Sequence, residues 1–77
     1  MRYPRVDVFK RTKHTPTYQE FFIVDTMRPN RPKCSKCWKT KLQADAYARR
    51  ELAFLKKEGY EKVVYNSMMI DLSKFIR

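Results

Sequence analysis

The residues of this chain with the clearest chemical role are the cations between positions 27 and 41. This segment, MRPNRPKCSKCWKTK, contains no acidic residue. Lysine and arginine neutralise phosphates and release counterions from a nucleic acid, and Trp38 offers a plane on which an unpaired base can stack. The segment therefore predicts binding to the phosphates of a nucleic acid. Its cationic side chains are Arg28, Arg31, Lys33, Lys36, Lys39 and Lys41.

Cys34 and Cys37 have the C-x-x-C spacing that suits two thiolate ligands of one zinc ion. A zinc ribbon supplies a second such pair, but this chain has two cysteines and one histidine, His14. A zinc site would need a carboxylate such as Asp25, a water, or a second chain sharing the ion. Ordinary reduced thiols in the cytoplasm are the simpler interpretation, so we expect no cofactor and no metal.

The charge of the whole chain also indicates a polyanionic partner. Its 77 residues include 18 Lys and Arg against 8 Asp and Glu, a net charge of +10. Residues 1–41 hold 11 of these cations and 3 of the acids, a balance of +8, whereas residues 42–77 contribute +2. The excess is thus concentrated in one half of the sequence. A polyanion, either a nucleic acid or an acidic protein, would be attracted to such a surface.

Catalysis and membrane insertion find little support in the sequence. There is no Gly-rich phosphate loop, no close pair of acids and only one histidine, so we expect that the chain is not an enzyme. No stretch approaches the roughly 20 apolar residues of a membrane-spanning helix. The length allows one domain, residues 1–77, with residues 27–39 as a long basic loop that contains prolines and cysteines.

Two strands are predicted before that loop. Val6 and Val8 alternate with polar residues over positions 5–12, and residues 17–26 are dense in aromatic and β-branched side chains. These segments should form an antiparallel hairpin. The strand aromatics could form a stacking surface on an exposed sheet face, but a small domain needs most of them in its core. They are Tyr3, Tyr18, Phe21, Phe22 and Tyr65.

A helix should begin after Thr40, which forms a capping box with Gln43, and should end at Gly59. One arc of this helix is apolar and should pack on the sheet. The opposite arc carries Arg49 and Arg50 with Lys56 and Lys57, a second cationic surface. The apolar arc consists of Ala44, Tyr47, Ala48, Leu52, Phe54 and Leu55.

The last element is predicted to be a third strand over residues 61–72. A short C-terminal helix is the alternative, because several apolar residues also fit helical spacing with Asn66 or Ser67 as a cap. Those residues are Met68, Met69, Leu72, Phe75 and Ile76. The expected fold class is α+β, a small two-layer ββαβ domain with one helix packed on a three-stranded antiparallel sheet.

The segment TKLQADAYARRELAFLKKEGYEKV, residues 40–63, resembles the closing part of WGR domains, in which a helix with spaced alanines runs into K-K-x-G-Y. The W-G-R strand of that family is absent, since Lys39 and Thr40 follow Trp38. The resemblance implies a link with nucleic acids and assigns no residue a role. The short, basic, glycine-poor composition is also similar to that of small proteins encoded by bacteriophages.

Together these features predict a small, non-enzymatic protein that binds DNA or RNA, either as a monomer or as a weak homodimer. The alternative is a module that docks its basic face on an acidic protein, for example as an inhibitor. The residues predicted to contact nucleic acid are Arg28, Arg31, Lys33, Lys36, Trp38, Lys39, Lys41, Arg49 and Arg50.

Overall fold

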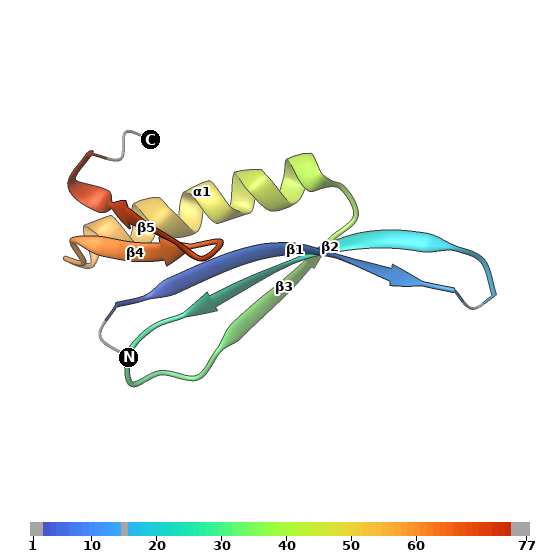
Figure 1. The fold of residues 1–77 in the computed structure, drawn as a ribbon, viewed down its shortest axis with the longest axis horizontal. Helices are drawn as coiled ribbons and strands as arrows, with labels where there is room; N and C mark the ends of the chain where they lie inside the picture. Colours follow the sequence, from blue (N-terminus) through green and yellow to red (C-terminus); the bar gives the residue numbers. More distant parts are fainter. Residues whose placement is uncertain (1–2, 15, 75–77) are drawn as a thin grey trace.

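The computed structural model describes residues 3–14 and 16–74, which form one five-stranded sheet with one helix along one side (Figure 1). The predicted α+β architecture of two layers is confirmed. The predicted sheet of three antiparallel strands is wrong, since the observed sheet has five strands and mixed directions. The elements are β1 (Arg5–Lys13), β2 (Gln19–Met27), β3 (Cys34–Trp38), α1 (Lys41–Lys57), β4 (Lys62–Tyr65), β5 (Met68–Asp71) and a 3-10 turn (Leu72–Lys74).

The predicted hairpin is formed by β1 and β2. Nine antiparallel residue pairs run from Arg5 opposite Met27 to Lys13 opposite Gln19. The outer part of this hairpin extends past the N-terminal end of α1 as a two-stranded arm (Figure 1). Beyond the pair of Lys10 and Phe22, no third strand of the described chain pairs with it.

The prediction of a loop over residues 27–39 is wrong in its second half, because β3 lies there. Pro29 is the second residue of a turn in which Arg31 N–H donates to the Arg28 carbonyl at 3.2 Å. Asn30 is the third residue of this turn and has φ 64°, as a type II turn requires. Both prolines of the segment precede the first paired residue of β3, an edge strand, so they block no ladder hydrogen bond.

The connection through α1 explains why the sheet is mixed. β3 is antiparallel to β2, β2 to β1, and β1 is parallel to β4, so β3 and β4 run in the same direction. A helix that joins two parallel strands must cross the sheet, and α1 therefore lies over β1 and β2, which stand between β3 and β4. The order β3-β2-β1-β4-β5 leaves β1 in the centre.

The C-terminal segment is a second hairpin rather than one strand. Tyr65 pairs with Met68, and the two residues between them, Asn66 and Ser67, have φ 49° and 68°. Positive φ at both central positions is typical of a type I′ hairpin turn. The Asn66 side chain also accepts a hydrogen bond from Val8 N–H at 2.8 Å, which ties the turn to β1. The predicted C-terminal helix is reduced to the 3-10 turn, and Phe75 and Ile76 lie outside the described residues.

Both ends of α1 lie where the sequence predicts them. The Thr40 hydroxyl accepts a hydrogen bond from Gln43 N–H at 3.2 Å. At the other end Gly59 has φ 102°; its N–H donates to the Lys56 carbonyl, and Tyr60 N–H donates to Leu55. This pair of bonds is the Schellman arrangement, in which a left-handed glycine lets the last carbonyls find donors.

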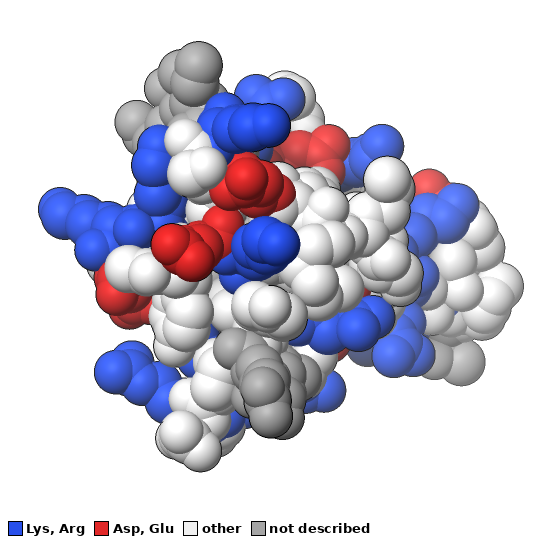
Figure 2. All heavy atoms as spheres, turned by 60° about the vertical axis from the view of Figure 1, so that its left-hand side comes forward, with Lys and Arg blue, Asp and Glu red and all other residues white. Residues whose placement is uncertain are grey.

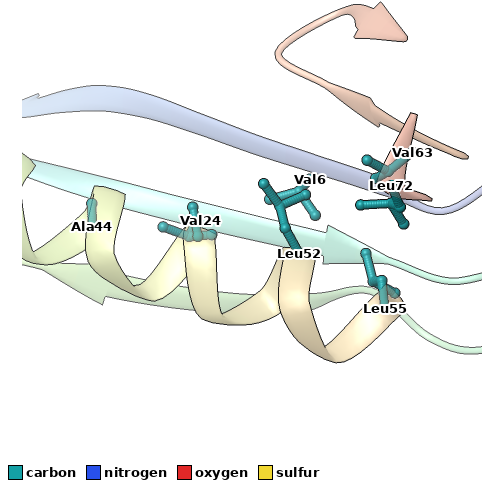
Figure 3. Close-up of a cluster of buried hydrophobic side chains, with 8 residues drawn as sticks. Val6, Val24, Ala44, Leu52, Leu55, Val63 and Leu72 are labelled. Carbon is teal, nitrogen blue, oxygen red and sulfur yellow. The ribbon is translucent and has the colours of Figure 1, made fainter. Parts of the chain in front are cut away.

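The core consists of a narrow stripe of α1 against the sheet and the C-terminal hairpin. Figure 3 shows Leu52 beside Val6 of β1, and Val63 of β4 beside Leu72. Phe54, predicted to face the sheet, is instead 57% exposed. It shares a flank of α1 with Tyr47, seven residues earlier, but only Tyr47 has the Trp38 ring beside it, 5.3 Å between centroids. The buried apolar residues are Val6, Val24, Ala44, Ala48, Leu52, Leu55, Val63 and Leu72.

Substitutions in the turn between β4 and β5 test the hydrogen bond from Val8 N–H to the Asn66 side chain and the positive φ of the turn. Asn66→Ala removes the bond to Val8 and the amide that favours positive φ, so the free energy of unfolding should fall by about 1–2 kcal/mol. Ser67→Gly relieves the backbone cost at φ 68° and should leave stability unchanged or raise it by about 1 kcal/mol. Urea denaturation followed by circular dichroism measures both. An Asn66→Ala protein as stable as the parent would show that its side chain does not hold the turn.

Candidate nucleic-acid interface

The sheet face opposite α1 carries its own set of side chains, and we call it the uncovered face. Val6 and Val24 point toward the helix, so their neighbours in sequence point away from it. The register places these neighbours in rows that cross the strands. From one end to the other the rows are Asp7, Asp25 and Ser35; then Phe9, Ile23 and Cys37; then Arg11 and Phe21; then Lys13 and Gln19.

The middle of the uncovered face is apolar and includes two aromatic rings. Phe9 and Phe21 are each half-buried, so part of each ring remains accessible. The guanidinium carbon of Arg11 lies over the Phe9 ring, 5.1 Å from its centroid. This contact combines a cation with an aromatic plane, the pairing that nucleic-acid-binding surfaces use for phosphates and bases.

Two lysines from distant parts of the sequence line one hollow at the arm end of this face. Lys13 of β1 and Lys39, just after β3, both line a hollow of about 610 Å³, which we call the lysine hollow. Phe21 belongs to β2, the strand between β1 and β3, and its side chain lines the same hollow. The remaining lining residues are Gln19, Glu20 and Cys37.

Glu20 is the one acid on that lining, and its charge is engaged within the arm. Tyr18 donates its hydroxyl hydrogen to Glu20 Oε2 at 2.9 Å, and Lys10 Nζ lies 3.3 Å from the same oxygen. The Tyr18 hydrogen bond first, and then Lys10, hold the pKa of Glu20 below its ordinary value. In the described chain no carboxylate forms an ion pair with Lys13 or Lys39.

Arg28, predicted to contact phosphate, is instead bound within the molecule. Its Nε donates to Glu58 Oε1 at 2.9 Å, its Nη1 lies 4.0 Å from Glu51 Oε1, and its side chain is only 16% exposed. Burial disfavours the charged guanidinium, but the Glu58 hydrogen bond and the two carboxylates outweigh it and raise the pKa of Arg28. Arg28 thus fastens the turn after β2 to the C-terminal half of α1.

The next predicted residues lie along the β2–β3 connection and β3. Lys33 Nζ is 3.9 Å from Asp25 Oδ2, a long contact between an exposed lysine and a largely buried carboxylate. Arg31 and Lys36 are exposed and form no ion pair within residues 3–14 and 16–74. Trp38 lies on the helix side of β3, half-buried against Tyr47, and its indole nitrogen has no hydrogen-bond partner in the described structure. Trp38 therefore anchors β3 to the core.

The helical cations line two other surfaces. Lys41 and Arg49 border a groove of about 430 Å³ between α1 and the β4–β5 hairpin, together with Asp45 and Tyr65. Burial, and then the charge of Asp45, raise the pKa of the Tyr65 hydroxyl. Arg50 lies on the outer surface of α1 beside the exposed Phe54.

The residues predicted to form one site therefore lie on several surfaces. Of these residues, Lys39 is the one that lines the lysine hollow. Figure 2 shows one side of the molecule with Lys and Arg spread over it and Asp and Glu among them. Sequence reasoning did not include Arg11, Lys13 and Phe9 in the candidate site. The available signal was that they stand at every second position, 9, 11 and 13, which places all three on the face opposite Val6 and Val8.

The cysteine pair does not have the geometry of a zinc knuckle. Cys34 and Cys37 both belong to β3, and residues three apart in a strand point to opposite faces. Cys34 lies opposite Thr26 on the helix side, and Cys37 opposite Ile23 on the uncovered face. Their thiolates therefore cannot both bind one ion, and within the described residues no three His, Cys, Asp or Glu side chains are grouped for a metal.

No protein family model, no curated protein and no solved structure matches this chain. The resemblance of residues 40–63 to WGR domains therefore rests on those residues alone. No helix in the described part of the chain combines the length and the apolar character that crossing a membrane requires.

The role of Arg28 in fastening the turn after β2 to α1 can be tested by measuring the free energy of unfolding of variants. Arg28→Ala leaves Glu58 without its charged donor and should lower the free energy of unfolding by about 1–2 kcal/mol. In a double-mutant cycle, Glu58→Gln should reduce the additional loss caused by Arg28→Ala, because the two changes remove the same interaction. Arg31→Ala, an exposed cation of the same segment, is the control and should change stability by less than about 0.5 kcal/mol. Equal effects of Arg28→Ala and Arg31→Ala would contradict this role.

Proposed function

We propose that this protein binds nucleic acid without catalysing a reaction, and that the uncovered face provides the contact. The observation that carries the proposal is the placement of Lys13 and Lys39 together with Phe21 in one hollow. Arg11 over Phe9 extends the same combination of cation and aromatic ring along the face. These groups come from β1, β2 and the segment after β3, so the fold brings them together.

Availability of charge argues against Arg28 and Lys33 as phosphate contacts, whereas Arg31 and Lys36 of the same segment form no ion pair within the described residues. Arg28 is engaged by two carboxylates and Lys33 is near one, which leaves less of their charge for a ligand. Arg11, Lys13 and Lys39 are exposed, and in the described residues no ion pair holds them. A phosphate at these side chains would therefore displace counterions without first breaking a salt bridge. The other cations add a long-range attraction consistent with a net charge of +10.

One observation favours a protein partner as the second candidate. Met68 and Met69 of β5, an edge strand, are 70% and 52% exposed. Flexible thioether side chains beside unpaired backbone groups suit the docking of another chain. The other residues that would serve as apolar anchors, Trp38 and Tyr60, pack against the core. Binding through β5 would persist at high salt and would not require Lys13 or Lys39.

The proposal predicts salt-dependent binding. If Arg11, Lys13 and Lys39 neutralise about three phosphates, log affinity should fall against log salt with a slope of roughly −2 on single strands and −3 on duplex DNA. Lys13→Gln/Lys39→Gln should weaken binding and flatten that slope by about 1.5, because two neutralised phosphates are lost. Fluorescence anisotropy with labelled DNA or RNA at several salt concentrations measures both.

The matched control removes two cations from the other side of the molecule. Arg50→Gln/Lys57→Gln changes the net charge equally but alters the outer surface of α1. It should lower affinity slightly and leave the slope almost unchanged. A flatter slope in this control than in the Lys13 and Lys39 variant would move the interface to the helix. Absence of any salt-dependent binding to nucleic acid would overturn the proposal.

A further inference from the structure

We propose that the uncovered face takes a single strand of nucleic acid, with neighbouring bases stacked on Phe21 and Phe9. This inference rests on the proposed function and adds the form of the ligand to it. It depends on the spacing of the two rings, on the cations beside them and on the acids at the far end of the same face.

The two rings are diagonal neighbours on adjacent strands. Phe9 lies opposite Ile23, and Phe21 lies opposite Arg11, two residues further along β1. Diagonal neighbours on one sheet face are about 7–8 Å apart. Stacked bases within a strand are separated by about 3.4 Å. Two neighbouring bases that each cover one ring must therefore leave their own stack, which costs less for an unpaired strand than for a duplex.

The cations lie where the phosphates of such a strand would run. Lys13 and Lys39 line the same hollow as Phe21, so a base on that ring has ammonium groups within reach of its phosphate. The Arg11 guanidinium carbon lies over the Phe9 ring, 5.1 Å from its centroid, so a base that stacks on this ring must displace the guanidinium or stack upon it. Arg11 can stack against a base or bind the phosphate that follows it.

The opposite end of the uncovered face limits the site. Asp7 and Asp25 form a row beyond Phe9, where a phosphate would meet two carboxylates. Arg5 Nε pairs with Asp7 at 2.8 Å, and Lys33 Nζ lies 3.9 Å from Asp25, which also accepts a hydrogen bond from Ser35 Oγ at 2.6 Å, so the cations nearest this row are already engaged by carboxylates. The strand should therefore cross β1 and β2 near the arm, over the rows that hold Phe9 and Phe21.

The test separates ring stacking from charge. Phe21→Leu and Phe9→Leu keep an apolar side chain but remove the plane, and each should weaken binding to an oligothymidine of about ten nucleotides by tenfold or more. The salt slope should stay as in the parent, because no charge is lost. Phe54→Leu removes the exposed ring of α1 and is the control, with unchanged affinity expected. Circular dichroism and thermal unfolding of each variant establish that it is folded.

Duplex DNA of the same length provides the second comparison, and the parent protein should bind it more weakly than the single strand. Tighter binding to the duplex, or a folded Phe21→Leu/Phe9→Leu protein that binds oligothymidine as the parent does, would overturn the single-strand inference. Salt-dependent duplex binding in that case would still support the proposed function. If the parent bound neither form with a salt dependence, both proposals would be overturned.

Discussion

The packing of a single helix on a single sheet face is the constraint on which the rest of this structure depends. Ala44 and Ala48 let α1 approach β1 and β2 closely, and Leu52 and Leu55 then fill the space toward β4 and the 3-10 turn. Full burial of a leucine or valine side chain contributes roughly 1.5–3 kcal/mol, so these few residues supply much of the apolar stabilisation. With its one long helix committed to this side, the described chain leaves the other sheet face without a helical layer.

That asymmetry explains why the two faces of the same strands differ. Alternation along β1 sends Val6 and Val8 into the core and Phe9 and Arg11 to the uncovered face. A face that only had to be soluble would not need aromatic rings in adjacent rows. Phe9 and Phe21, half-buried beside cations on that face, are the rings on which the proposed contact with a ligand depends.

The sequence predicted those parts of the fold that depend on neighbouring residues. The Thr40 cap, the Gly59 end and the β1–β2 hairpin are local patterns, and each formed as expected. β3 was not predicted, because Pro29 and Pro32 disfavour a strand at their own positions, although both precede the paired residues Cys34–Trp38. The parallel pairing of β1 with β4 joins residues about sixty positions apart, a contact that no local pattern specifies.

The same reasoning explains what could be predicted of the candidate site. A count of cations predicts a polyanionic partner and includes Lys39 among the candidate contacts, because charge is additive along the sequence. It could not distinguish Lys39 from Arg28, since that difference is set by Glu51 and Glu58, which approach Arg28 only after α1 has packed on the sheet. Lys13 was overlooked for the converse reason: its importance comes from its position near Lys39, not from its own neighbours.

Trp38 and Phe21 illustrate how strand alternation decides which aromatic residues can serve a ligand. Phe22 lies opposite Trp38, so both side chains point toward α1, where Tyr47 covers the indole ring. Phe21, one residue earlier in β2, must then point to the other face. The more conspicuous aromatic residue of the basic segment thus anchors β3, while a phenylalanine within a run of apolar residues remains accessible beside Lys13 and Lys39. A shift of one residue in the pairing of β3 with β2 would turn Trp38 to the uncovered face and leave Phe21 in place, because β2 is also paired with β1, so the register of the edge strand determines on which face the indole ring lies.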